Sequence, residues 1–486
     1  MIKSAVISKL AVANATIALQ LQQIALLEAK VAPLETKVAP LEAKVVFLEA
    51  KVMSLEAKVM LLLNLLEKSS TKKDSHNSSL PPSSDLFTAQ TKSLRPLSVL
   101  KNGGQLGHKG HTLQISATPD VIHELKSNYC THCRASLEAA SFVLKATRQV
   151  IELPPITPIY EEYRQFGCIC PNCQHEQVAA FPLGVNSPIQ YGSTVEALVS
   201  YYSVGQYLPF ARLQKMFSQV FSLPLSQGTV ANILERTALK CQGVYEKIKV
   251  QIAESQVVGS DETSAKVNGD KWWIWVWQTI CYTFIVASKS RGSETIENVW
   301  ADKLANVTLV TDRWAAQLKT ITKGFQICLA HLLRNIIFLD ESEKHPFATQ
   351  FKQFMVDVFS ITKQLIQIGT PYQTEQKEAK IIEKRLNDLL LMSIDKEKYP
   401  HTLTFQASMI KYRNYLLPCL YNLEIPPDNN GSERAIRNIK VKQKVSGQFK
   451  SGQNAFCIIR SIIDTLTKKG VEVLPFLNQI IKLQPE

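Results

Sequence analysis

Three acidic residues stand where a fold could gather them for metal-dependent chemistry. Asp261 lies at the end of a predicted strand, Asp312 at the end of another, and Glu433 in the first turn of a predicted helix. Strand ends that face one edge of a sheet are where catalytic groups collect. Three carboxylates there would bind two Mg²⁺ or Mn²⁺ ions about 3.5–4 Å apart, which activate a hydroxyl and stabilise the leaving oxygen of a phosphodiester. A lone Asp is usually a cap or a surface residue, so this hypothesis rests on the ordered set.

The segment around Glu433 is strongly basic. From Gly431 to Gly470 there are nine Lys or Arg residues and two acidic ones, a net charge of +7 within a chain whose net charge is +13. A positive excess of this size points to a polyanionic partner, either nucleic acid or an anionic membrane. The candidates to bind DNA phosphates beside the metals are Arg434, Arg437, Lys440, Lys442 and Lys444.

Hydrophobic periodicity predicts the elements that position the acids. Alternation of period two predicts strands over residues 272–277, 281–287 and 307–311, with a helix over 294–303. The run of tryptophans in the first strand is most simply one packed face. Residues 325–331 predict another short strand. The predicted strands and the three acids thus fall in two segments, 251–338 and 425–470, which are separated by a strongly helical pattern over 339–424 and followed by a C-terminal tail over 471–486.

Residues 183–250 are predicted to be helical and to bind DNA. One amphipathic helix covers 212–221, a turn follows at 223–225, and Ser226 can cap a second helix over 228–240. This arrangement resembles a helix-turn-helix. Helical hairpins are also common in plain protein cores, so both interpretations stay open.

Two CxxC pairs lie upstream in residues 119–182. Such pairs can close a tetrahedral zinc site, with expected strands such as 142–153 filling the loop between them. Other candidate ligands are Cys168, His132 and His175. A redox pair is the alternative, but two pairs in one unit favour structural Zn²⁺. The predicted zinc ligands are Cys130, Cys133, Cys170 and Cys173.

The N-terminal segment, 1–68, repeats every seven residues. β-Branched residues at position a (Val31 to Val59) and Leu at position d (Leu34 to Leu62) favour a parallel dimeric coiled coil. Glu at e and Lys at g can pair across such a dimer. Because proline inside a helix costs about 3 kcal/mol, Pro33 and Pro40 limit the secure coiled coil to about residues 41–66. A helix folded onto its own protein is the alternative.

Composition excludes several classes of protein. The chain has 486 residues, 45% hydrophobic and 20% charged, which is typical of soluble multidomain proteins. We identify no apolar run of 18–20 residues and no signal peptide, and so expect a cytoplasmic, nucleoid-associated protein without a membrane partner. The segment 69–118 is rich in Ser, Pro, Gly and Lys, and is either a plain linker or a DNA-binding arm.

Several long motifs resemble one family. The chain is similar to the large transposase of bacterial insertion sequence 66 elements, over about residues 73–469. The motifs are HNSSLPPSSD, GGQLGHKGHTL, the two CxxC pairs, YGSTVEALVSYYSVGQYLPFARLQ, LSQGTV, DETSAKVNG, TDRWAA, CLAHLLRN and NNGSERAIRNIKVKQKVSGQF. The resemblance implies a ribonuclease H-like domain of the DDE type, with Asp261, Asp312 and Glu433 as its acidic triad and the helical segment 339–424 as an insertion. It also implies terminal inverted repeats as the DNA substrate and companion proteins from the same element.

Some features depart from the family or stay ambiguous. Gly431 and Ser432 precede Glu433 where bulkier residues are expected. His331 and Arg334, in a family motif, are candidates to contact DNA. For Trp314 two roles stay open, stacking on a flipped DNA base or packing in the protein core.

We therefore predict a multidomain α+β DNA transposase. A coiled coil, a zinc-ribbon-like module, a helical DNA-binding region and a ribonuclease H-like catalytic domain follow one another along the chain. The rival is a catalytically silent, transposase-derived DNA-binding protein. A coiled-coil scaffold without a DNA role leaves the basic segment unexplained.

Overall fold

The computed structural model describes residues 2–70, 77, 107, 109–110 and 113–483. The predicted linker 69–118 lies almost wholly outside these residues. The chain forms two compact units. The first holds the N-terminal helix with Asn335–Gln350 and Ser393–Thr404, and the second holds most of the rest.

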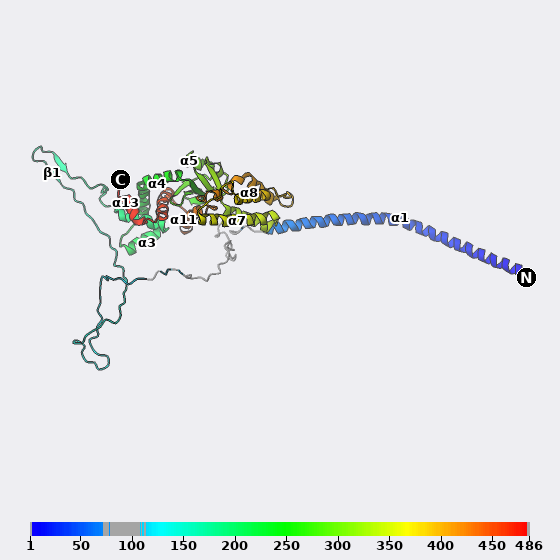
Figure 1. Cartoon of the computed structure of the whole chain (residues 1–486), viewed down its shortest axis with the longest axis horizontal. Helices are drawn as coiled ribbons and strands as arrows, with labels where there is room; N and C mark the ends of the chain where they lie inside the picture. Colours follow the sequence, from blue (N-terminus) through cyan, green and yellow to red (C-terminus); the bar gives the residue numbers. More distant parts are fainter. Residues whose placement is uncertain (1, 71–76, 78–106, 108, 111–112, 484–486) are drawn as a thin grey trace. The chain divides into compact units, whose positions relative to one another are not determined.

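The N-terminal helix α1 spans Ile2–Ser70 without a break (Figure 1). Both Pro33 and Pro40 lie inside this helix, so they do not end it, and the limit of 41–66 for the coiled coil stays a prediction. Each proline leaves one carbonyl without its helical donor, and long helices tolerate such a local loss. The described a and d side chains are about half exposed, for example Val45 at 53% and Leu55 at 54%. The helix thus presents a continuous apolar seam.

By length and mean hydropathy alone, one described helix could cross a membrane. It is Ile7–Met60 within α1, with a window of mean hydropathy 1.5. No charged residue occurs between Leu10 and Leu27. The expectation that no run is apolar enough was therefore too strict, because uncharged polar residues in this segment only partly lower its mean hydropathy.

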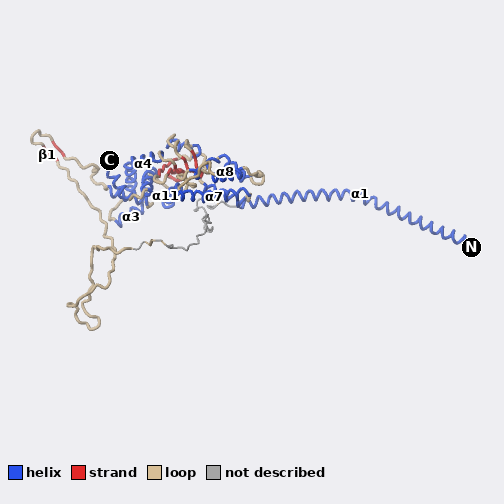
Figure 2. The backbone as a smooth tube through the Cα atoms, in the orientation of Figure 1, coloured by secondary structure: helices blue, strands red, loops and turns tan. Residues whose placement is uncertain are grey.

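A five-stranded sheet lies at the centre of the second unit (Figure 2). The strands are β3 Val257–Val267, β4 Asp270–Gln278, β5 Thr283–Ser288, β6 Thr308–Thr311 and β7 Gly324–Ile327. Their order is β5-β4-β3-β6-β7, with β3, β4 and β5 antiparallel and β6 and β7 parallel to β3. The predicted strand over 325–331 is shorter than expected, because the helix α6 (Leu329–Ser342) already includes His331.

Tryptophans form the core of one sheet face, as predicted. Trp275 and Trp277 are fully buried and stacked at 5.8 Å between ring centroids. Trp300, the last residue of α5 (Ser293–Trp300), packs edge-on against Trp277 at 5.4 Å. Large stacked rings bury much apolar surface, so this face of the sheet is a fixed scaffold.

Two helices close the open edge of the sheet at β5. On helix α12 (Gln453–Lys468), the Thr465 hydroxyl accepts the Thr283 N–H at 3.1 Å, and the Ser461 hydroxyl accepts the Ile285 N–H at 2.9 Å. On helix α4 (Gln227–Ala253), the hydroxyl of Tyr245 donates to the Ile285 carbonyl at 2.7 Å. These bonds satisfy backbone groups that an edge strand would leave unpaired.

The helices upstream of the sheet agree with the sequence pattern. They are α2 Ser193–Ser200, the π-helix η2 Tyr201–Gly205, α3 Phe210–Val220 and α4 Gln227–Ala253. Ser226 caps α4 as predicted, accepting the Thr229 N–H at 2.9 Å. The helix runs past residue 240 because Cys241, Ile248 and Ile252 extend its buried stripe.

The predicted insertion is helical. Its elements are α7 Pro346–Ile368, α8 Lys377–Leu390, α9 Pro400–Lys411, the 3-10 turn η4 Arg413–Tyr415 and α10 Pro418–Tyr421. Another short 3-10 turn, η3 Gln317–Lys319, follows β6. The chain ends in α11 Asn430–Ser446, α12, and α13 Val473–Leu483.

Candidate active site

Strand β3 carries two adjacent acids whose side chains point to opposite faces of the sheet. Asp261 pairs with Val276 and Glu262 with Trp275 on β4. Asp261 lies in the middle of β3 and not at its end, because the pairing with β4 continues to Val267. The register thus places Glu262 on the tryptophan face and Asp261 on the other face.

Asp312 directly follows β6, as predicted. The parallel register pairs Gly259 with Val310, so Asp261 and Asp312, two residues further along, lie level with each other. The Asp312 Oδ1 atom accepts the N–H of Trp314 at 2.9 Å. The short strand and this turn therefore bring the second acid to the first.

Glu433 lies in the first turn of α11, as predicted. The helix entry is tied to β3, because the Asn429 side-chain amide donates to the Ser260 carbonyl at 2.7 Å. The Ser432 hydroxyl in turn donates to the Asn429 Oδ1 at 2.7 Å. These buried bonds set where α11 begins, and hence where Glu433 lies.

The small residues before Glu433 have a packing reason. A Cβ atom on Gly259 would lie 2.6 to 2.8 Å from side-chain atoms of Gln278, Ser432 and Asn429. A Cβ on Gly431 would collide with Gln278 even more closely. At Gly259 a Cβ would press on three side chains at once, whereas at Gly431 the end of the Gln278 side chain alone would have to move. We expected bulkier residues than Gly431 and Ser432 before Glu433, and the close contact between the start of α11 and the strands explains why small ones stand there.

We expect Gly259→Ala to lower the free energy of unfolding by about 1–3 kcal/mol, because the extra methyl overpacks this contact. Gly243→Ala is the matched control, since no atom lies within 4 Å of its Cβ position and alanine favours a helix interior by about 0.5–1 kcal/mol. Urea unfolding of both variants measures the difference. Equal stability of the two would contradict the tight helix entry.

The three acids influence one another electrostatically. Burial raises the pKa of Asp261 well above its ordinary value, and the charges of Asp312, Glu262 and Glu433 raise this pKa further. The N–H of Glu262, which donates to Asp261 Oδ1 at 2.9 Å, acts in the opposite direction. Crowded carboxylates that disfavour ionisation are typical of sites that bind a cation.

Two predicted DNA-contacting residues lie against Glu433 instead of projecting freely. His331 Nε2 is 3.7 Å and Arg334 Nη1 is 3.6 Å from Glu433 Oε1. This Oε1 and the His331 Nδ1 are buried without a hydrogen-bond partner. Burial lowers the pKa of His331, and the charge of Arg334 lowers this pKa further. The charges of Glu433 and Asp312 act in the opposite direction and raise it. The cluster of Glu433, His331 and Arg334 is therefore polar and mostly buried, and two of its atoms lack hydrogen-bond partners.

The side chains of Asp261, Asp312 and Glu433 are not arranged as a complete metal-binding site. Among the described residues, no group of three or more His, Cys, Asp or Glu side chains is placed to hold a metal ion. The donor chemistry nevertheless suits a hard cation, because the charges of Asp312 and Glu433 both act on the Asp261 carboxyl and the buried Glu433 Oε1 lacks a hydrogen-bond partner.

The predicted basic residues of α11 separate into two groups. Arg434, Arg437 and Lys444 are exposed. Lys440 donates to the Ser264 carbonyl at 3.1 Å. Lys442 is only 8% exposed and lies over the Phe210 ring, and burial lowers its pKa to about 8. The exposed three share one helical face, whereas Lys440 and Lys442 are engaged within the fold.

The four predicted zinc ligands form two similar turns. The Cys130 carbonyl accepts the Arg134 N–H at 2.8 Å, and the Cys170 carbonyl accepts the Gln174 N–H at 2.9 Å. Arg134 and Gln174 both have φ near 60°. The N–H groups of Cys133 and Cys173 lower the pKa of the Cys130 and Cys170 thiols, respectively.

The second turn lies within the hairpin of β1 (Gly167–Ile169) and β2 (Glu176–Val178), and Cys168 sits in β1. The strand predicted over 142–153 is absent from the described residues there. The turns are thus built separately, and the structure does not assemble them into one site.

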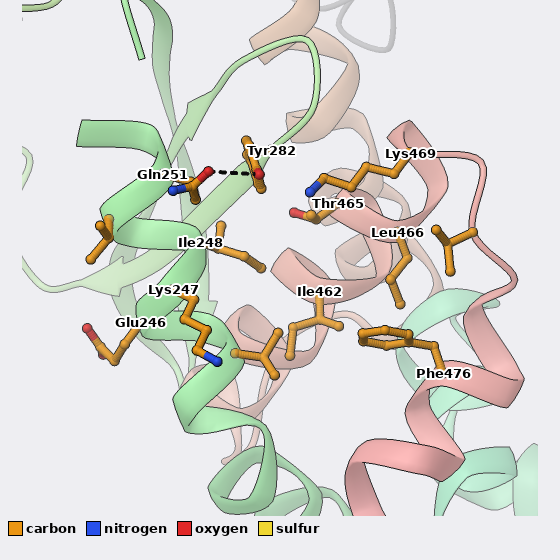
Figure 3. A pocket seen from close by; sticks show the side chains of 13 residues that line it. Glu246, Lys247, Ile248, Gln251, Tyr282, Ile462, Thr465, Leu466, Lys469 and Phe476 are labelled. Carbon is orange, nitrogen blue, oxygen red and sulfur yellow. Dashed lines mark hydrogen bonds between the residues drawn. The ribbon is translucent and has the colours of Figure 1, made fainter. Parts of the chain in front are cut away.

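A separate cavity of about 580 Å³ opens between α4, α12 and α13 (Figure 3). Tyr282 donates to Gln251 at 2.9 Å at its rim, and Lys469 lies over the Tyr282 ring at 4.0 Å. Its lining includes none of the predicted site residues. This hollow is therefore not where the acids gather.

Sequence reasoning missed the residues around Asp312. Arg313 has φ of 76°, a strained conformation for a residue other than glycine. Its guanidinium donates to the Ser408 hydroxyl at 3.1 Å. Arg291, whose guanidinium lies 3.7 Å from the centre of the Trp314 ring, was also missed. These partners are distant in sequence, so no local spacing signals them.

A family model described as "Transposase IS66 family" matches residues 188–456. The match contains all three acids and ends before α13. No curated protein matches the chain.

Proposed function

The chain belongs to the IS66 transposase family, and we propose that it is a DNA transposase that cuts and joins DNA strands by a DDE two-metal mechanism. The observation that carries the proposal is that Asp261 lies on β3 beside β6, which Asp312 follows, and that the charges of Asp312 and Glu433 both raise the pKa of Asp261. The substrates are the terminal inverted repeats of the element and a target DNA. Companion proteins of the element complete the machinery, and the protein acts in the bacterial cytoplasm.

The sheet supports a ribonuclease H-like catalytic domain. An antiparallel meander of three strands is followed by two parallel ones, in the order β5-β4-β3-β6-β7. Asp261 occupies the first strand, Asp312 the end of the fourth, and Glu433 a helix after the helical elements of the insertion. Function still rests on the acids and not on the fold, because one fold serves many chemistries.

Asp261 and Asp312 would hold divalent metal between them, with Glu433 as the third ligand. Bound there, Mg²⁺ or Mn²⁺ would supply an activated hydroxyl and stabilise the leaving oxygen. Water adds to the phosphodiester at the element end and releases a 3′ hydroxyl. That hydroxyl then displaces the bridging oxygen of a target phosphodiester, so no covalent protein–DNA intermediate is required.

The Arg334 guanidinium, 3.6 Å from Glu433 Oε1, balances the charge of Glu433, and the His331 imidazole lies 3.7 Å from the same oxygen. Once Glu433 turns to metal, the Arg334 guanidinium is available to the scissile phosphate, for which its planar donors are suited.

We further propose that the exposed face of α11 contacts DNA phosphates. Arg434→Ala with Arg437→Ala should lower the slope of log K against log salt concentration by about 2, because each phosphate contact releases about one counterion. Fluorescence anisotropy with a terminal-repeat duplex measures this slope. Lys303→Ala with Lys323→Ala is the matched control, because these exposed lysines precede β6 and β7, at the opposite ends of the strands. Equal slopes for the two variants would contradict the assignment.

The two cysteine turns are proposed to meet on one Zn²⁺ ion. Each turn lowers the pKa of its first thiol, and thiolates are the zinc-binding form. We expect about one zinc per chain, as a tetrahedral site with four cysteine ligands requires. Elemental analysis should show that Cys170→Ser loses this zinc while Cys168→Ser keeps it. Zinc lost equally from both would assign Cys168 to the site, and no zinc in the wild type would favour a redox role.

Helix α1 is proposed to dimerise through its a and d seam. The Lys residues at g and Glu residues at e would pair across a parallel dimer. Dimerisation would bring two element ends together. The rival function, a silent DNA-binding protein, needs this helix and the cysteine turns but none of the three acids.

A further inference from the structure

An ion pair between buried Glu262 and partly exposed Arg291 lies on the tryptophan face of the sheet. Glu262 is 9% exposed. Its Oε1 accepts the Arg291 Nε at 2.9 Å, with Arg291 Nη2 also at 2.9 Å. Its Oε2 accepts the Gln317 side-chain amide at 2.6 Å. Both oxygens are therefore engaged, and Glu262 is not free to act as a metal ligand.

Arg291 is held between two indole rings. Its guanidinium carbon lies 3.7 Å from the centre of Trp314 and 4.7 Å from that of Trp273. The Trp314 indole N–H donates to the Arg291 carbonyl at 3.3 Å. A stacked, forked guanidinium is fixed in both position and orientation.

The same residues reach both catalytic aspartates through the backbone. The Glu262 N–H donates to Asp261 Oδ1 at 2.9 Å, and the Trp314 N–H donates to Asp312 Oδ1 at 2.9 Å. A continuous path thus runs from one carboxylate to the other through Glu262, Arg291 and Trp314. It joins the middle of β3 to the turn after β6 independently of the strand pairing.

We propose that Glu262, Arg291 and Trp314 are positioning residues that hold the two aspartate carboxylates in the orientation for metal binding. This inference rests on the proposed function, because it presumes that Asp261 and Asp312 hold divalent metal. Outer partners of metal ligands set ligand orientation, and their loss typically weakens metal binding about 10–100-fold.

The test is Mn²⁺ titration followed by electron paramagnetic resonance on the full-length protein. We expect Trp314→Ala and Arg291→Lys each to weaken the Mn²⁺ affinity by at least about 10-fold, while Trp314→Phe, which keeps a stacking ring, restores most of it. Trp272→Ala is the matched control, because Trp272 is half-buried, lies on the other face and contacts Lys289. It should leave the affinity unchanged.

Thermal unfolding without metal separates positioning from folding. Trp314 is half-buried, so its Ala variant should stay folded even where Arg291→Lys does not. Folded Trp314→Ala with an affinity within two-fold of wild type would overturn the positioning role. If the wild type binds no Mn²⁺, or binds it equally well after Asp261→Asn, the proposed function on which this inference rests would instead be overturned.

Discussion

Asp261→Asn is expected to reduce DNA strand cleavage by at least about 10³-fold, since removing one member of a catalytic set usually costs this much or more. The carboxylate loses its charge while its size is kept, so the fold and the exposed face of α11 should be unaffected. DNA affinity should be equal or slightly tighter. Single-turnover cleavage of a labelled terminal-repeat duplex measures the rate, and anisotropy measures binding.

The same variant should be more stable than the wild type without metal. Because the folded-state pKa of Asp261 is raised, the stability it contributes is lost as pH rises through that pKa. Asparagine removes this cost, so its gain in the free energy of unfolding should vanish in acid and grow as pH rises from the ordinary pKa of an aspartate to the raised pKa of Asp261. Asp302→Asn, at an exposed position before β6, is the control. Unchanged cleavage in Asp261→Asn would favour the silent DNA-binding rival.

Replacing two seam leucines should dissociate the oligomer. Leu48→Glu with Leu55→Glu removes apolar surface worth about 1.5–3 kcal/mol per side chain when buried and places like charges opposite each other. We expect the dimer dissociation constant to rise by at least about 10³-fold. Sedimentation equilibrium measures the change. Binding to one DNA end should persist, and pairing of two ends should be lost.

The control for the leucine pair is a pair of apolar residues of the same helix that lies outside the a and d seam. Val46 and Met53 are also apolar and are 65% and 71% exposed, but they occupy position b of the heptad. Val46→Glu with Met53→Glu should leave the dimer intact. Dissociation by both pairs, or a wild type that is monomeric at all concentrations, would contradict a coiled-coil dimer.

Local signals in the sequence predicted much of this architecture. Alternation predicted β4 and β6, a serine predicted the start of α4, and the pattern placed Asp312 after a strand and Glu433 in the first turn of a helix, as the structure shows. The errors have physical causes. We predicted that Asp261 ends a strand. In the structure β3 continues past it, and the turn at Asn268 and Gly269 marks where the strand stops. The helix α1 continues through Pro33 and Pro40, which the cost of proline inside a helix did not lead us to expect.

The remaining features depend on long-range contacts. Nothing near Glu262 in the sequence indicates that Arg291 binds it, and Gly431 looked anomalous until Gln278 was found against it. Lys442 was predicted to be a phosphate ligand from its charge alone, but helical phase directs it inward. Such pairings depend on how β3, β4 and α11 pack, which spacing along one sequence does not reveal.

The central claim is that the converged acids make this chain a metal-dependent DNA-cutting enzyme. The most direct measurement is to incubate the full-length protein with an end-labelled terminal-repeat duplex, its companion proteins, and Mg²⁺, Mn²⁺ or chelator. We predict cleavage at the element end that leaves a 3′ hydroxyl, requires metal and is lost in Asp261→Asn. Tight binding of the duplex without metal-dependent cleavage, with the companions present, would contradict the account.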